Sequence, residues 1–150
     1  MANACSLASL SAIAACDAIV DRCEGGTPPA ELVIYYGASI PTYADDAAGT
    51  EVATCICQNP AFGSAAADAG NHWAEADLDV TPTCQDTSAT GNANAVNYFR
   101  IWTGTSHAVV LQGTAGQTSG YDLNLNAAII GAGAQVDITA LQVRVPYNQA

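Results

Sequence analysis

The chain contains no lysine, and its arginines are Arg22, Arg100 and Arg144. They are outnumbered by 14 acidic residues, so the formal net charge is −11 at pH 7. A phosphate backbone and an anionic membrane surface both attract clustered lysines and arginines. We therefore expect neither nucleic acid nor a membrane as a partner.

The missing lysine also excludes a common nucleotide site. A P-loop needs a lysine that reaches the phosphates, so the glycine-rich stretches 113–116 and 131–133 do not form one. The G-x-S-x-G elbow of many hydrolases is absent from the sequence. Pairs of carboxylates, as glycosidases use, arise by chance among 14 acidic residues. We predict no catalytic residues, no cofactor and no enzymatic activity.

Charge of either sign is scarce. Charged residues make up 11% of the chain, against roughly 25% in an average soluble domain. One interpretation is that partners cover much of the surface, as in an oligomer or a large assembly. The other is that a neutral surface of small residues is simply tolerated. Composition alone leaves both open.

Long apolar runs are missing as well. No stretch approaches the ~18 apolar residues of a membrane span. Residues 1–24 lack the basic start of a secretion signal, and Asp17 and Asp21 interrupt their apolar character. We therefore expect synthesis in a reducing cytoplasm, with the six cysteines mostly free and buried. Cys55 and Cys57 lie two apart in a strand pattern, on one face, without the usual geometry of a disulfide.

The most informative stretch present is 133–146, which alternates like a strand but changes phase. Its apolar residues form two sets of opposite parity: Val136, Ile138 and Ala140, then Leu141, Val143 and Val145. Because alternate residues of a strand point to opposite faces, an unbroken strand would expose one set. A β-bulge near Thr139–Ala140 would return both sets to the core. We predict a long, bent, central strand that ends at Pro146.

The rest of the chain predicts one helix followed by a β domain. The helix begins at Ser6 or Ser9, with serine as its N-cap, and runs to Glu24 before Gly25-Gly26. Its predicted buried stripe is Leu10, Ile13, Cys16 or Asp17, Val20 and Cys23. Further strands are predicted at 31–36, 50–58, 72–80, 95–103, 106–112 and 122–126, of which 95–103 carries bulky residues on both faces and should be covered on both sides.

This pattern is typical of an antiparallel β-sandwich or jelly roll. We expect a single domain, 1–150, with an N-terminal helix arm at 1–26 and the β-sandwich at 31–146. Residues 64–71 are rich in alanine, aspartate and glycine, which favours a mobile segment or one shaped by a partner.

The histidines, cysteines and aspartates of the chain do not have the spacing of known metal sites. His72 and His107, even with Cys84 or the pair Cys55 and Cys57, lack the close C-x₂₋₄-C spacing of zinc sites. The pairs Asp45-Asp46 and Asp77 with Asp79 offer oxygen ligands, but without EF-hand spacing they are expected to be solvated acidic loops. We predict no metal site.

Aromatic residues could form either a sugar-stacking or protein-contact platform or part of the core. Tyr98 and Trp102 lie in mid-strand, which favours core packing. Tyr43 and Tyr147 lie in a loop and the tail, where contact with a partner is more expected. Trp73 is a further candidate for a sugar-binding aromatic.

Several segments in order resemble a family of small β-rich virion proteins of tailed bacteriophages. They are Ala14–Asp21, Leu32–Gly37, Asn59–Gly63, Tyr98–Ile101, Gly120–Asn126 and Val136–Pro146. The chain departs from that family in its cysteine content and in the long region 64–90. The resemblance implies a capsid decoration, or cement, protein on the capsid surface of the virion, a viral structural protein made in the host cytoplasm. It also implies that the chain binds the major capsid protein and assembles as a homotrimer, with a homodimer as the alternative.

Two other hypotheses remain open at this stage. The chain could be a tail, baseplate or adhesion component that binds glycan through Tyr43 or Trp73. It could also be a hydrolase on a β-sandwich, which would require an acidic pair held in a cleft.

Overall fold

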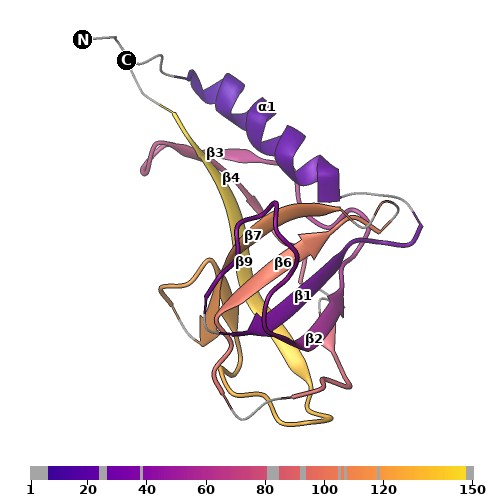
Figure 1. Ribbon diagram of the computed structural model, residues 1–150. Coiled ribbons are helices and arrows are strands. Elements are labelled where there is room, and N and C mark those ends of the chain that lie inside the picture. The colour runs from indigo at the N-terminus through magenta and orange to yellow at the C-terminus, as the bar shows by residue number, and fades with distance from the viewer. Residues whose placement is uncertain are drawn as a thin grey trace.

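The structure is a computed structural model that describes residues 7–23, 27–37, 39–80, 85–91, 94–104, 106, 108–117 and 119–147. Within these residues it contains one α-helix, one short 3₁₀ helix and nine strands (Figure 1). The elements are α1 (Ser9–Val20), η1 (Asp21–Cys23), β1 (Glu31–Tyr36), β2 (Thr50–Ile56), β3 (Ala66–Asp68), β4 (Trp73–Asp77), β5 (Gln85–Asp86), β6 (Tyr98–Trp102), β7 (Val109–Gln117), β8 (Leu123–Leu125) and β9 (Val136–Pro146). The chain is therefore mainly β with one N-terminal helix, as its sequence predicts.

The strands form one mixed sheet in the order β2-β1-β6-β7-β8-β9-β4-β3, with β5 paired to β9. The strands predicted at 95–103 and 106–112 are found as the antiparallel neighbours β6 and β7, and β7 continues to Gln117. The prediction of a purely antiparallel sheet is wrong at one place, because β7 and β8 run parallel, with Ala115 beside Leu123. Parallel neighbours usually need a crossover of a dozen or more residues. Here β8 is only three residues long, and it begins six residues after the end of β7.

The sheet curls until β5 lies between β9 and β2. Gln85 and Asp86 pair with β9, and the carboxylate of Asp86 accepts a hydrogen bond from the Thr54 amide of β2 (2.9 Å). Shortly after β5, the Thr90 amide donates to the Val52 carbonyl (2.8 Å). These contacts satisfy backbone groups along the free edge of β2, which would otherwise be exposed. One continuous core results, and it unites the inner faces of the strands with α1.

The predicted bulge in the last strand is confirmed. Along β9, Leu125 pairs with Ile138 but Asn124 pairs with Ala140, so Thr139 is the extra residue. Val136 and Ile138 are buried before it, and Leu141 is buried after it. The bulge thus returns the apolar side of β9 to the core after the change of parity. The predicted central position is also confirmed, because β9 pairs with β8 on one side and with β4 on the other.

The helix is confirmed, and so is most of its predicted buried stripe: Cys16, Val20 and Cys23 are buried and Ile13 packs against the core, whereas Leu10 is not buried. Its N-cap is Ala8, which makes no side-chain capping bond, rather than a serine. Its buried residues are Ala12, Cys16 and Val20, and Cys23 follows in η1. Leu10, the first member of the predicted stripe, is instead 79% exposed. Alanine on every side of α1 blurs the apolar periodicity, so packing against β4 and β9 selects the face. The predicted stop at Gly25-Gly26 lies outside the described residues.

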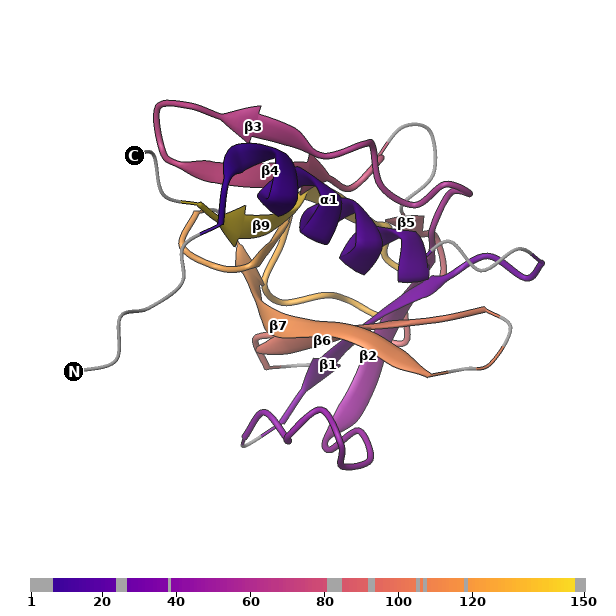
Figure 2. The same ribbon diagram turned by 90° about the horizontal axis from the view of Figure 1, so that it is seen from above.

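Figure 2 shows where these parts lie relative to one another. Strands β3, β4 and β9 lie on one side with α1, and β7, β6, β1 and β2 lie on the other. The segment 64–71 contributes the edge strand β3, paired to β4 from Ala66 to Asp68, so part of it has a regular structure of its own. The connection from β1 to β2 lies on the side of β1 and β2 that faces away from α1.

Candidate binding surfaces

Nowhere in the described part of the chain do three or more histidine, cysteine, aspartate or glutamate side chains gather as metal ligands. His107 and Cys84 lie outside the described residues. No helix in the described ranges is both long enough and apolar enough to cross a membrane.

His72 has a local structural role. It lies in the turn between β3 and β4 with a φ of +59°, in the left-handed region that few side chains adopt. Its amide donates to the Asp68 carbonyl (3.0 Å), and its own carbonyl accepts from the Tyr147 amide (2.9 Å). Its ring meets the Tyr147 ring edge to face, with centroids 6.3 Å apart. Tyr147 is itself buried, contrary to the expectation that it would be available to a partner.

Residues of both predicted acidic pairs form hydrogen bonds with nearby parts of the chain. One carboxylate oxygen of Asp45 accepts from the Thr42 hydroxyl (2.7 Å). Asp77 accepts from the side-chain amide of Gln142 (2.6 Å), and the Asp79 amide donates to the Ala61 carbonyl (2.9 Å). These contacts hold loops and strands in place.

The most unusual single group is the buried guanidinium of Arg100, in mid-strand in β6. Its side chain is on the face of the sheet that points away from α1, and its exposed fraction is 0%. Nη1 donates to the Asp45 carbonyl (2.9 Å) and Nη2 to the Thr42 carbonyl (2.9 Å). Nε donates to the side-chain oxygen of Gln112 on β7 (2.7 Å), and the Gln112 amide donates onward to the Pro41 carbonyl (2.7 Å). All three acceptors of Arg100 are neutral oxygens.

Neighbouring residues fix both ends of the same connection. The side-chain amide of Asn97 donates to the Gly37 carbonyl (2.8 Å). The Tyr98 hydroxyl donates to the Ala48 carbonyl, and the Tyr98 ring stacks on Tyr35 with centroids 4.9 Å apart. We call residues 39–48 the β1–β2 loop. The hydrogen bonds from Asn97, Tyr98, Arg100 and Gln112 to the carbonyls of Gly37, Pro41, Thr42, Asp45 and Ala48 all end in or just before this loop, so these side chains set its shape.

The β1–β2 loop exposes a tyrosine and an isoleucine. Tyr43 is 78% exposed and Ile40 is 40% exposed. Asp45 and Asp46 are exposed beside them. Tyr98 is fully buried and Trp102 is packed against the Tyr35–Tyr98 cluster, so core packing is confirmed for both. The loop therefore combines an exposed aromatic ring with carboxylates on an ordered backbone.

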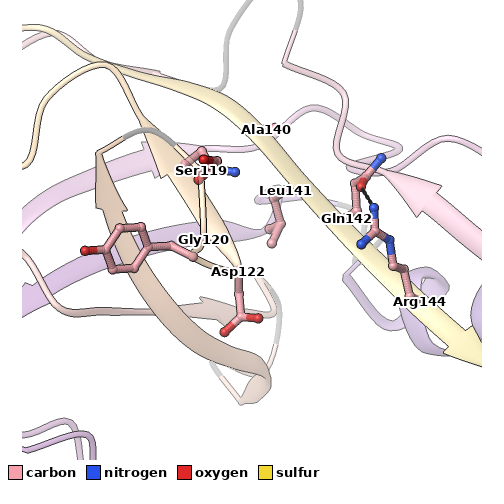
Figure 3. Close-up of a pocket in the computed structure, with 9 residues that line it drawn as sticks. Ser119, Gly120, Asp122, Ala140, Leu141, Gln142 and Arg144 are labelled. Carbon is pink, nitrogen blue, oxygen red and sulfur yellow. Dashed lines mark hydrogen bonds between the residues drawn. The ribbon is translucent and has the colours of Figure 1, made fainter.

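A polar groove lies between residues 119–124 and the outer face of β9 (Figure 3). Its volume is about 530 Å³, and its lining is Ser119, Gly120, Tyr121, Asp122, Asn124, Ala140, Leu141, Gln142 and Arg144. The side-chain oxygen of Asn124 is buried without a hydrogen-bond partner. Asp122 is held by the Thr114 amide and hydroxyl, at 2.8 Å each. Such a lining suits a neutral, hydroxyl-rich ligand better than an apolar one.

Gly116 explains how Tyr121 reaches its place beside the groove. A Cβ atom on Gly116 would lie 2.4 Å from the Tyr121 ring. The stretch 113–116 is therefore not a phosphate loop but part of β7, and its last glycine gives the ring room to approach the backbone.

Next to the groove, β4 and β9 carry a row of paired side chains. Arg144 lies opposite Glu75 in the register and forms an ion pair with it (3.2 Å). The Arg144 guanidinium lies over the Trp73 ring, 4.3 Å from its centroid, and hydrogen-bonds Gln142. The Trp73 indole donates to Glu75 (3.1 Å). One face of Trp73 is thus already occupied by a cation, which leaves less of the ring for a sugar.

A second cavity, of about 490 Å³, is lined by Asp17, Asp21, Pro60, Phe62, Gly63 and Ser64. Asp17 and Asp21 are the two acidic residues in this lining. Asp17 accepts a hydrogen bond of 2.6 Å from the Ala65 amide. That bond ties α1 to the segment that precedes β3.

The outer face of α1 is apolar although it is exposed. Leu10 is 79% and Leu7 is 42% exposed, and Ala14 and Ala18 follow on the same side of the helix. The opposite face, formed by Ala12, Cys16 and Val20, is apolar and buried. The helix α1 is therefore apolar nearly all round. Such helices are normally covered on every side.

The cysteines in the described part of the chain, Cys16, Cys23, Cys55 and Cys57, are buried thiols. Burial, and then the Asp86 carboxylate, raise the pKa of Cys55 to about 12. Burial, and then Asp17, raise the pKa of Cys16, and its thiol donates to the Val143 carbonyl (3.3 Å). The prediction of buried thiols is confirmed for these four. Cys5 and Cys84 lie outside the described residues.

Sequence reasoning missed the role of Arg100. The available signal was a charged residue between Phe99 and Ile101 in a strand expected to be covered on both sides. It did not reveal which loop supplies the acceptors, because these are backbone carbonyls that carry no sequence signature.

No protein-family model, curated protein or solved structure matches the chain.

Proposed function

We propose that this chain is a capsid decoration protein of a tailed bacteriophage, with a structural rather than a catalytic role. In this proposal it binds the outer surface of the shell formed by the major capsid protein and stabilises contacts between capsomers. It does so as a homo-oligomer, preferably a trimer. The two sides of the curled sheet would form the layers of a jelly-roll-like sandwich, an arrangement supported by the separation of β3-β4-β9 from β2-β1-β6-β7 in Figure 2.

The observation that carries the proposal is the apolar outer face of α1. Leu7 and Leu10 are exposed there, above small alanines that let another surface approach closely. A protein that worked as an isolated monomer would gain nothing from this face, whereas an assembly protein buries it. The low content of charge agrees with a surface that partners cover. An oligomer also attaches at several points, which raises avidity without a strong single contact.

Absolute quantification of purified virions by mass spectrometry tests the proposal. We expect a simple ratio of this chain to the major capsid protein, such as one to one. A trace amount would place the chain in the tail, and its absence from particles would refute a virion role.

Self-association is tested separately by sedimentation of the purified chain. Leu10→Glu adds a charge to the outer face of α1 and should yield monomers. Ile129→Glu is the matched control, because Ile129 is also well exposed (61%) but lies far along the chain, between β8 and β9. Equal oligomers of both variants would show that α1 is not the interface.

A tail or adhesion role with glycan binding is the second candidate, and the groove beside β9 favours it. Tyr121 offers a half-exposed ring, and Asn124 has a buried oxygen without a partner. Screening on a glycan array tests this role. Binding that is lost in Tyr121→Ala would support it, and loss in Tyr43→Ala or Trp73→Ala would locate the sugar elsewhere. A chain that binds no glycan would exclude it.

A further inference from the structure

The β1–β2 loop shows a contrast between a fully buried charge and a highly exposed aromatic ring. Arg100 is 0% exposed beneath the loop, and Tyr43 is 78% exposed on it. The two carbonyls that the guanidinium binds belong to Thr42 and Asp45, which flank Tyr43 and Ala44. Arg100 therefore holds the backbone on both sides of the exposed ring.

Stability alone does not explain a buried arginine at this position. Desolvating a guanidinium carries a large penalty, and well-packed apolar residues often serve as well or better in a core. The adjoining cluster of Val33, Tyr35 and Tyr98 is apolar or aromatic, so an apolar residue would suit its surroundings. What an apolar residue cannot do is bind the carbonyls of one particular loop conformation. Arg100 thus specifies the shape of the loop.

A fixed loop conformation matters when the loop binds something. An ordered loop loses less conformational entropy on association than a mobile one. Tyrosine is also among the residues that most often dominate binding energy at interfaces. Ile40 adds apolar area to the same loop. The ordered backbone and the exposed ring together are what a docking element requires.

The charge beside Tyr43 indicates the chemistry of the partner. Asp45 and Asp46 are exposed next to the ring, so a complementary surface carries lysine or arginine around an apolar pocket. A second copy of this chain matches such a surface poorly. It has no lysine, Arg100 is buried, and Arg144 already pairs with Glu75. Arg22 in η1 is exposed, but one arginine does not make a basic rim. The partner is therefore a different protein.

We propose that the β1–β2 loop docks on a different protein, with Tyr43 inserted into an apolar pocket that has a basic rim. This inference rests on the proposed function, in which that protein is the capsid shell, and it assigns the contact to a specific loop. The face of α1 would then serve self-association, while the loop serves attachment.

The test measures binding of the purified chain to heads assembled from a genome that lacks its gene. Three proteins are compared by co-sedimentation over a range of concentrations: the unaltered chain, Tyr43→Ala and Ile129→Ala. Ile129 is the control, because it is a large exposed apolar side chain on a different connection (61% exposed) and lines none of the candidate binding surfaces. We expect Tyr43→Ala to bind about 30-fold more weakly or worse, as for a residue that dominates an interface. Ile129→Ala should bind within about twofold of the unaltered chain, since single exposed side chains away from an interface contribute little.

A second arm tests the charge of the rim. Asp46→Asn removes one carboxylate and leaves the Arg100 contacts in place. It should weaken binding at low salt and reduce the dependence of affinity on salt.

The outcomes separate the two proposals. Binding by the unaltered chain that Tyr43→Ala retains in full overturns the loop inference and leaves the decoration function standing. Equal weakening by Tyr43→Ala and Ile129→Ala also overturns it. Failure of the unaltered chain to bind heads overturns both. Circular dichroism of each variant verifies that weak binding does not result from unfolding.

Discussion

Arg100 binds Asp45 through its backbone carbonyl, at 2.9 Å, while the carboxylate of the same aspartate accepts a hydrogen bond from Thr42. The buried guanidinium thus binds the backbone of the loop and not the charged side chain of Asp45.

Arg100→Lys keeps the charge but loses the planar fork that reaches three acceptors at once. We expect it to lower the free energy of unfolding by about 2–4 kcal/mol, as for a buried charge left with unsatisfied partners. Urea unfolding measures this loss. Arg144→Lys is the control, because Arg144 is half exposed and its replacement should change stability by less than about 1 kcal/mol. Equal effects would show that the loop contacts of Arg100 add nothing.

Cys55 should be unreactive in the folded protein and should make stability fall at high pH. The raised pKa of about 12 means that the thiol stays protonated well above its ordinary value of 9.0. The unfolded chain then releases this proton at lower pH than the folded one. The contribution of the protonated Cys55 thiol to the free energy of unfolding is fully present below pH 9. It is lost as the pH rises towards 12, by at most about 1.4 kcal/mol per pH unit.

Two measurements test the prediction for Cys55. Alkylation at pH 8, followed by peptide mapping, should label Cys55 only after denaturant is added. The unfolding free energy of Cys55→Ala should depend less on pH between 9 and 11 than that of the unaltered chain. Rapid labelling of Cys55 in the native protein would contradict its burial.

Gly104 should tolerate no side chain. A Cβ atom there would lie 1.8 Å from the Pro28 carbonyl oxygen and 2.4 Å from that of Pro29. Because both obstacles are backbone, Gly104→Ala must displace the chain and should cost on the order of 3 kcal/mol. Gly131→Ala is the matched control, since nothing lies within 4 Å of its Cβ position. Thermal unfolding compares the two, and similar melting temperatures would contradict the close approach.

The Trp73–Arg144 pair should be visible by fluorescence but contribute little to stability. The guanidinium lies 4.3 Å from the ring centroid at a partly exposed site, where a cation–π contact is worth about 0.5–1 kcal/mol. In a Trp102→Phe background, Arg144→Gln should shift the emission of Trp73 and lower stability by about that amount. An unchanged emission spectrum would mean that the two groups do not stack in solution.

The features that could be predicted from the sequence are those marked by a regular pattern of apolar residues. The bulge in β9 follows from the parity change between Ile138 and Leu141. The coverage of β6 on both sides follows from the bulky residues on each of its faces. In both cases the burial of apolar side chains determines the local structure, and the positions of these residues in the sequence show it directly.

The remaining features depend on contacts that the sequence does not record. The stripe predicted for α1 is right at Cys16 and Val20 but wrong at Leu10, because alanine offers similar burial on every side of the helix. The parallel β7–β8 pair depends on a short connection that no local pattern distinguishes from a hairpin. Among the candidate binding surfaces, the exposure of Tyr43 was anticipated from its loop, whereas the burial of Tyr147 depends on its contact with His72 and Asp68.

The bulge at Thr139 also restricts how the length of β9 can change. Deleting this one residue would remove the bulge and space Val136, Ile138 and Leu141 two apart, so all three would still face the core from a regular strand. β8 pairs with β9 on both sides of the bulge, whereas β5 pairs only before it and β4 only after it. Loss of a single residue is therefore tolerable at Thr139, whereas a change of length by one residue elsewhere in β9 would turn one part of its apolar side outward.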